Sequence, residues 1–98
     1  MRIAIVGAGA MGAVVARELL AAAPDTALAL IDANVDRLHA LADALSPVVV
    51  GTHRHDASDP TALAAALTGI DLVVNAAQYD VNLPVMRACL LAGCHYLD

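Results

Sequence analysis

The segment Gly7–Gly12, with the sequence Gly-Ala-Gly-Ala-Met-Gly, constrains this chain more than any other. It follows an apolar run, Ile3–Val6, and precedes a segment with helical spacing, Val14–Ala23. A Gly-x-Gly-x-x-Gly pattern between a strand and a helix is the dinucleotide-binding turn. The first glycine permits the tight turn, the second lets a pyrophosphate approach the backbone, and the third lets the helix pack closely on the strand. The pyrophosphate would face unpaired N–H groups at the positive end of the helix dipole.

An acidic residue follows at the position that this fingerprint requires. A second apolar run, Ala27–Ile31, ends at Asp32, where a carboxylate about 20 residues beyond the turn binds the adenosine ribose hydroxyls. In the simpler interpretation the glycines only make a turn and Asp32 only caps a helix. The agreement of spacing, strand and helix favours the nucleotide. The sequence therefore predicts an NAD site, with NADP as the alternative, and its first residues are Gly7, Gly9, Ala10, Met11, Gly12 and Asp32.

The length and composition bound the fold. Ninety-eight residues make one small domain, 1–98, which is short for a whole dehydrogenase. The chain is 60% hydrophobic, above the roughly 45–50% that is typical of globular proteins. We therefore expect a face that is covered by something outside this chain, either a further domain or a second copy in a homo-oligomer.

Several classes of function are disfavoured. The formal net charge is -5 and no basic run is present, so nucleic acid is not an expected partner. No apolar stretch reaches the ~18 residues of a membrane span, and the first strand begins at once, without a signal peptide. Cys89 and Cys94 have the spacing of neither a zinc site nor a redox pair. Reduced thiols in a cytoplasmic protein are the simplest interpretation.

Strand and helix signals alternate along the chain. Continuous apolar strands are typical of a parallel sheet that is covered on both faces, and right-handed crossovers give a doubly wound order. We therefore predict an α/β fold, a Rossmann-like doubly wound parallel sheet of about five strands in the order 3-2-1-4-5. The expected strands are Arg2–Val6, Thr26–Ile31, Val48–Val50, Asp71–Asn75 and His95–Leu97. The expected helices are Met11–Ala23, Asn34–Leu45 ended by Ser46-Pro47, one from Asp59-Pro60 to Gly69, and one with Pro84 in its first turn that stops at Gly93.

Ligands of such a sheet lie at the carboxyl ends of its strands. Asp56 follows the third strand and is predicted to meet the adenine amino group, or else to be a solvated loop carboxylate. Asn75, Ala76 and Ala77 follow the fourth strand and are predicted on the nicotinamide side, or else to be ordinary strand-end packing. Arg37 would stack on adenine or reach a 2′-phosphate, unless it is a solvated helix residue.

The chain offers no convincing acid–base or nucleophilic group, so the catalytic residues stay unassigned. His53 and His55 form an H-x-H pair, but a metal needs further ligands and we predict no metal site. His95, Tyr96 and Asp98 cluster at the end of the last strand. They would touch a substrate, or they are strand residues without a direct role.

Three segments carry a resemblance to a known family: 71–77 (Asp-Leu-Val-Val-Asn-Ala-Ala), 83–89 (Leu-Pro-Val-Met-Arg-Ala-Cys) and 92–98 (Ala-Gly-Cys-His-Tyr-Leu-Asp). The chain resembles the amino-terminal NAD(P)-binding domain of the saccharopine dehydrogenase family. Lysine dehydrogenases, carboxynorspermidine dehydrogenase and homospermidine synthase are relatives.

The resemblance implies an NAD(P)-dependent oxidoreductase that transfers hydride at a C–N bond of an amino-acid-like substrate. In this family a substrate domain normally follows. Because the chain stops at Asp98, we expect it to be inactive alone.

Two other functions remain open. A non-catalytic nucleotide-sensing regulatory domain of a potassium-transport system also pairs the glycine turn with an acid after the second strand. A methyltransferase that uses S-adenosylmethionine also binds a ribose through a carboxylate. The 75–77 and 95–98 segments favour the enzyme family, and the Met11-Gly12 completion of the fingerprint argues mildly against the methyltransferase.

Overall fold

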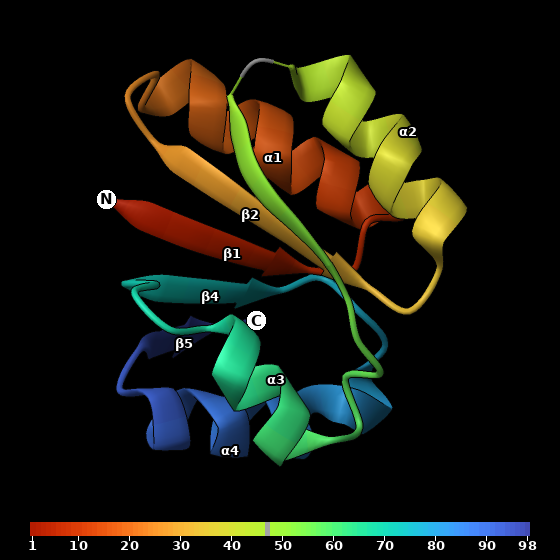
Figure 1. Ribbon diagram of the computed structural model, residues 1–98. Helices are drawn as coiled ribbons and strands as arrows, with labels where there is room; N and C mark the ends of the chain where they lie inside the picture. The colour runs from red at the N-terminus through yellow and green to blue at the C-terminus, as the bar shows by residue number, and fades with distance from the viewer. Residues whose placement is uncertain (47) are drawn as a thin grey trace.

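The computed structural model describes residues 1–46 and 48–98. Five strands of this part form one sheet of order β3-β2-β1-β4-β5, in which every neighbouring pair is parallel (Figure 1). This confirms the predicted doubly wound α/β fold. The strands are β1 (Arg2–Val6), β2 (Ala27–Asp32), β3 (Val49–Arg54), β4 (Leu72–Asn75) and β5 (His95–Leu97). The helices are α1 (Ala10–Ala22), α2 (Val35–Leu45), α3 (Pro60–Ala66) and α4 (Asn82–Ala92), with a short 3-10 turn at Tyr79–Val81.

Helices cover both faces of the sheet. Figure 1 shows α1 and α2 on one side and α3 and α4 on the other. Alternate residues of each strand point to opposite faces, so the sheet separates two hydrophobic cores. On the α1–α2 side the buried residues include Ile3, Ile5, Leu28, Leu30, Leu38 and Leu41. On the α3–α4 side they include Val6, Ile31, Leu63, Leu67, Val73 and Val85. Burial on both faces explains why these strands have continuous apolar sequences.

Local signals fix most of the helix ends. The side chain of Asn34 accepts hydrogen bonds from the N–H groups of Asp36 and Arg37 and caps α2. Asp59 accepts from the N–H of Ala62 and caps α3, with Pro60 in the first turn. Helix α4 stops at Gly93, which is left-handed with φ 77° and closes the helix through its N–H.

Two boundaries differ from the prediction by more than a single residue. Strand β3 continues to Arg54 instead of ending at Val50, because its register with β2 extends to the pairing of Asp32 with Arg54. Helix α3 ends at Ala66, before Gly69, which adopts φ 80° in the following turn. Pro47, the expected stop of the second helix, lies outside the described residues. None of the described helices is long and apolar enough to cross a membrane.

Candidate dinucleotide-binding site

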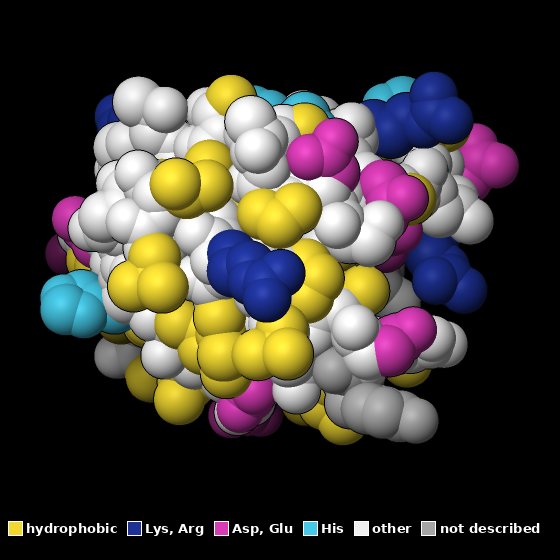
Figure 2. All heavy atoms as spheres, turned by 90° about the horizontal axis from the view of Figure 1, so that it is seen from below, with side chains coloured by type: hydrophobic (Ala, Val, Ile, Leu, Met, Phe, Trp, Pro, Cys, Tyr) yellow, Lys and Arg dark blue, Asp and Glu magenta, His cyan; other side chains and the backbone are white. Residues whose placement is uncertain are grey.

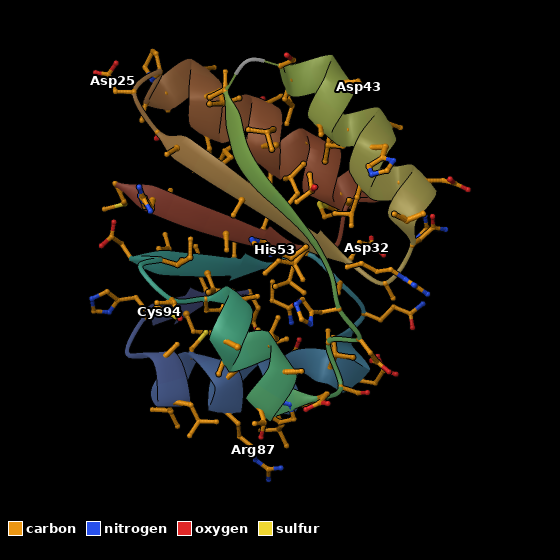
Figure 3. All side chains as sticks on the ribbon, in the orientation of Figure 1. Asp25, Asp32, Asp43, His53, Arg87 and Cys94 are labelled. Carbon is orange, nitrogen blue, oxygen red and sulfur yellow. The ribbon has the colours of Figure 1, made fainter. Side chains whose placement is uncertain are left out.

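An open cavity of about 420 Å³ lies at the carboxyl ends of β1, β2, β3 and β4. Figure 3 shows Asp32 at this end of the sheet. The cavity collects residues from four separate loops, which follow the four strands. Nine of the predicted site residues line it: Gly7, Gly9, Ala10, Met11, Asp32, Arg37, Asp56, Ala76 and Ala77. Gly12 and Asn75, the other two predicted residues, are buried behind the lining.

Each of the three positions in the turn requires a glycine for a different structural reason. Gly7 has φ 101°, and a Cβ there would lie 2.9 Å from the backbone of Ala76 and Ala77. A Cβ on Gly12 would collide with the carbonyl oxygen of Gly7. A Cβ on Gly9 would meet only Arg37 Nη1, at 3.9 Å. Gly7 and Gly12 are therefore required by the fold, whereas Gly9 leaves open space on the cavity side, as a bound pyrophosphate requires.

The start of α1 adds an electrostatic attraction for a phosphate. Gly9 is the N-cap of this 13-residue helix and supplies no side-chain hydrogen bond, and no acidic side chain occupies the first turn. The N–H groups at a helix start carry partial positive charge and favour an anion. The open space at Gly9 and the N–H groups at the start of α1 therefore fit a dinucleotide pyrophosphate.

Asp32 connects the glycine turn to the loop that follows β2. One carboxylate oxygen accepts a hydrogen bond from Ala8 N–H at 2.8 Å, and the other accepts from Asn34 N–H at 2.9 Å. Each oxygen retains acceptor capacity, because a carboxylate has about four lone-pair sites. The side chain is half-buried and lines the cavity. Asp32 can therefore order both loops and still accept from a ribose hydroxyl.

Two arginines lie near the same loop. Arg37 lines the cavity opposite Gly9. Arg54 Nε, at the end of β3, donates to the carbonyl of Ala33 at 3.3 Å. Both side chains are exposed. This arrangement places cationic groups within the region of Asp32, where a 2′-phosphate of NADP is bound in this type of fold.

Asp56 lies on the loop that follows β3. Its carboxylate accepts hydrogen bonds from Ser58 Oγ at 2.7 Å and Ser58 N–H at 2.9 Å. These bonds hold the pKa of Asp56 below its ordinary value of 3.8, so the group is ionised near neutral pH. A second oxygen stays available at the cavity wall for a donor such as an amino group.

Sequence reasoning missed several lining residues, of which His55, Gln78 and Asp80 are polar. They lie in the segments that follow β3 and β4. The rule that ligands bind at the carboxyl ends of strands could therefore have identified them. The apolar lining that was also missed comprises Val6, Ile31, Ala33, Ala57 and Val81.

The remaining candidates lie elsewhere. His53 is on β3 (Figure 3) and is not a lining residue. Among residues 1–46 and 48–98 no group of three or more His, Cys, Asp or Glu could hold a metal ion. Tyr96 and Asp98 are hydrogen-bonded to each other at 3.0 Å, and neither they nor His95 line the cavity.

Comparison with known proteins confirms the resemblance. A family profile described as the saccharopine dehydrogenase NADP binding domain matches residues 3–98. The fold is similar to apo saccharopine dehydrogenase (L-Glu forming) from Saccharomyces cerevisiae, with a TM-score of 0.77 and 20% identity over 97% of this chain and 20% of that chain. It is also similar to the NADPH-dependent quinone oxidoreductase from Escherichia coli, with a TM-score of 0.74 and 28% identity over 94% of this chain and 32% of that chain.

The same quinone oxidoreductase has a structure in complex with NADPH, at 26% identity and a TM-score of 0.74, over 94% of this chain and 34% of that chain. The chain thus spans between 20% and 34% of the length of these proteins. The family match identifies it as an NAD(P)-binding domain of the oxidoreductase type.

Proposed function

The chain belongs to the saccharopine dehydrogenase family, and from that premise we propose that it serves an oxidoreductase that transfers hydride at a C–N bond of an amino-acid-like substrate. The observation that carries the proposal is the match of the NADP-binding domain of this family to residues 3–98. The domain supplies the cofactor half of the reaction, and a substrate domain outside these residues supplies the other half. We also propose that the protein is located in the cytoplasm.

The cofactor would occupy the cavity in a defined direction. Gly7, Gly9, Ala10 and Met11 would hold the pyrophosphate at the start of α1, with Gly12 keeping that helix against the turn. Asp32 would accept from the adenosine ribose, and Asp56 would accept from the adenine amino group. The nicotinamide half would then extend to Ala76 and Ala77, whose small side chains leave room for a ring.

The bound cofactor supplies or accepts the hydride. The residues of this chain contribute orientation, because a fixed pyrophosphate and a fixed ribose leave the ring few directions in which to point. Arg37 and the start of α1 offset the negative charge that Asp32, Asp56 and Asp80 bring to the cavity. No described side chain in the cavity has a geometry that assigns it a proton-transfer step, so the acid or base is expected on the substrate domain.

The proposed hydride transfer at a C–N bond is tested by comparing two classes of substrate. The chain, and the longer product if its gene continues past Asp98, is incubated with NADPH or NADH, and oxidation of the reduced nicotinamide is followed by absorbance. One arm contains an amine with a 2-oxo acid, which together form an imine, and the other contains a quinone. We expect turnover by the longer product with the imine-forming pair, and none by the 98-residue chain alone. Turnover with the quinone only would contradict the proposal and favour a quinone reductase.

A further inference from the structure

A hydrogen-bonded network lies directly behind the Ala76–Ala77 wall of the cavity. Asn75 is 6% exposed. Its Nδ2 donates to Asn82 Oδ1 at 2.8 Å and to Tyr96 Oη at 3.2 Å. Its Oδ1 accepts from Ala77 N–H at 3.1 Å. The network therefore connects the end of β4 to the first turn of α4 and to β5.

The hydrogens of the Asn75 amide are committed inside the protein. A side-chain amide has two N–H donors, and both have partners here. Asn75 is also absent from the cavity lining. It can therefore influence a bound cofactor only through the adjoining Ala76–Ala77 segment, in which its Oδ1 accepts from Ala77 N–H.

That segment packs against the glycine turn. Ala76 N–H donates to the carbonyl of Val6 at 2.8 Å. A Cβ on Gly7 would lie 2.9 Å from the carbonyl carbon of Ala76, so the two backbones are in close contact. A displacement of Ala76–Ala77 would change the cavity wall at the point where the turn leaves β1.

Tyr96 supports the network from β5. Its Oη accepts from Asn75 and donates to Asp98 Oδ2 at 3.0 Å. Burial raises the pKa of Tyr96 above its ordinary value of 10.0. The phenol is therefore protonated near neutral pH and keeps both hydrogen bonds in the directions described.

We propose that Asn82 and Tyr96, acting through Asn75, are positioning residues that hold Ala76–Ala77 in the conformation that receives the nicotinamide half of the cofactor. The inference rests on the proposed function, because it requires the nicotinamide to lie against this wall. It differs from a purely structural role in one respect: the network should affect the nicotinamide half of the ligand and leave the adenosine half unaffected.

Two disrupting variants and one conservative control test this selectivity. Tyr96→Phe removes the acceptor for Asn75 Nδ2 and keeps the ring. Asn82→Leu removes the other acceptor at nearly constant shape, whereas Asn82→Asp retains an acceptor oxygen. Each is titrated with a dinucleotide and with its matching fragment that lacks nicotinamide: NADH against ADP-ribose, and NADPH against 2′-phospho-ADP-ribose. Circular dichroism and thermal melting check that each variant is folded.

We expect Tyr96→Phe and Asn82→Leu to lower the ratio of dinucleotide affinity to fragment affinity by about fivefold, the scale of one lost hydrogen bond. Asn82→Asp should keep the ratio within about twofold of the wild-type value. Exchange of the Ala77 amide hydrogen should become faster in the two disrupting variants, because the Asn75 acceptor loses its orientation.

The outcomes separate this inference from the function on which it rests. If the wild-type chain binds dinucleotide more tightly than fragment and both disrupting variants keep that ratio, the network has no positioning role and the inference is wrong. Equal losses for dinucleotide and fragment would also overturn it, since they indicate a general structural effect. If the wild-type chain binds the dinucleotide no more tightly than the fragment, the proposed placement of the nicotinamide is itself wrong, and the inference fails with it.

Discussion

The backbone N–H of Ala8 donates a hydrogen bond to the carboxylate of Asp32 at 2.8 Å. This bond joins the glycine turn to the end of β2. The second oxygen of the same carboxylate accepts from Asn34, the residue that caps α2. Asp32 therefore organises the glycine turn, the end of β2 and the start of α2, and its charge also enters the choice between NAD and NADP.

The first prediction concerns that choice. We expect the chain to favour NAD, and Asp32→Ser to erase or invert the preference. One unit-charge repulsion between a carboxylate and a 2′-phosphate is ~4 kcal/mol at ~4 Å and an effective dielectric of ~20. Solvent and salt at an open cavity reduce this to about 1–2 kcal/mol, which is about five- to thirtyfold in relative affinity. Calorimetric titration with NAD and NADP measures the ratio.

Arg37 provides the opposing control for this prediction. Arg37→Gln removes a cation from the cavity lining, and we expect it to weaken NADP more than NAD. Tighter binding of NADP than of NAD by the native chain would show that Asp32 does not govern the selection, and that Arg37 or Arg54 outweighs it.

The second prediction concerns the glycine turn. Gly9→Val places a branched side chain in the open space beside the expected pyrophosphate. Dinucleotide affinity should fall by about tenfold or more, equivalent to about 1.4 kcal/mol, while the melting temperature changes little. Gly12→Ala is the contrasting variant, because its Cβ would meet the Gly7 carbonyl and should destabilise the fold itself. Full nucleotide affinity in a folded Gly9→Val chain would place the pyrophosphate elsewhere.

The third prediction concerns alkaline pH. Burial, followed by the influence of Cys94, raises the pKa of the Cys89 thiol from 9.0 to about 12. The folded state therefore favours the neutral thiol, and the unfolded chain ionises first as the pH rises. The free energy of unfolding should be unaffected by this group below pH 9.0 and should fall between pH 9.0 and about 12. Chemical denaturation across this range measures the effect.

Cys89→Ala and Cys94→Ala are the matched variants for the alkaline prediction. Cys89 is 2% exposed, whereas Cys94 is half-buried. The alkaline loss should shrink in Cys89→Ala and persist in Cys94→Ala. The same burial predicts that a thiol reagent labels Cys89 only after denaturation. An identical pH dependence in the wild type and in Cys89→Ala would contradict the assignment.

The fourth prediction concerns the outer surface of α4. Figure 2 looks onto the α3–α4 side and shows hydrophobic side chains around a basic one, and Figure 3 shows Arg87 pointing outward from α4. The exposed hydrophobic residues of this helix are Leu83, Leu90 and Leu91. A contiguous apolar patch favours association or dye binding, so we expect the chain to form a homo-oligomer or to bind a hydrophobic dye.

Leu90→Lys tests the patch most directly, because Leu90 is 83% exposed and the change should leave stability within about 0.5 kcal/mol. Burial of one leucine side chain is worth about 1.5–3 kcal/mol, so an oligomer that covers Leu90 should weaken about tenfold or more. Ala21→Lys, on the exposed surface of α1, is the control. Sedimentation of the wild type as a strict monomer without dye binding would show that the exposed patch has no such role.

The sequence contained most of the fold because the signals were local and strong. Apolar runs without alternation indicated strands that are buried on both faces, and the glycine turn located the first crossover. β3 was the weakest prediction. Beyond Val50 its sequence is Gly-Thr-His-Arg, which lacks an apolar run because β3 lies at the edge of the sheet. Its extension depends on pairing with β2 as far as Arg54, and pairing across a sheet has no signature within a single segment.

The candidate site was predictable to the same degree. Glycine spacing and the position of Asp32 depend on one short stretch of chain, and a strand-end rule supplied Asp56, Ala76 and Ala77. Asn75 shows the limit of that rule. A residue at the end of a strand points into the cavity or behind it according to its neighbours, and Tyr96 and Asn82 take the Asn75 amide to the far side. Those partners come from separate elements, so only the folded arrangement shows the direction.

The unequal surroundings of Gly9 and Gly12 have a consequence for how this sequence can change over generations. A substitution at Gly12 would bring a Cβ against the Gly7 carbonyl and is expected to destabilise the fold, so such alleles would be lost through degradation. A substitution at Gly9 meets open space and is expected to leave a stable domain with weakened dinucleotide binding. A single mutation at Gly9 could thus convert a redox domain into a scaffold that descendants retain for other purposes, with two of the three glycines of the fingerprint still intact.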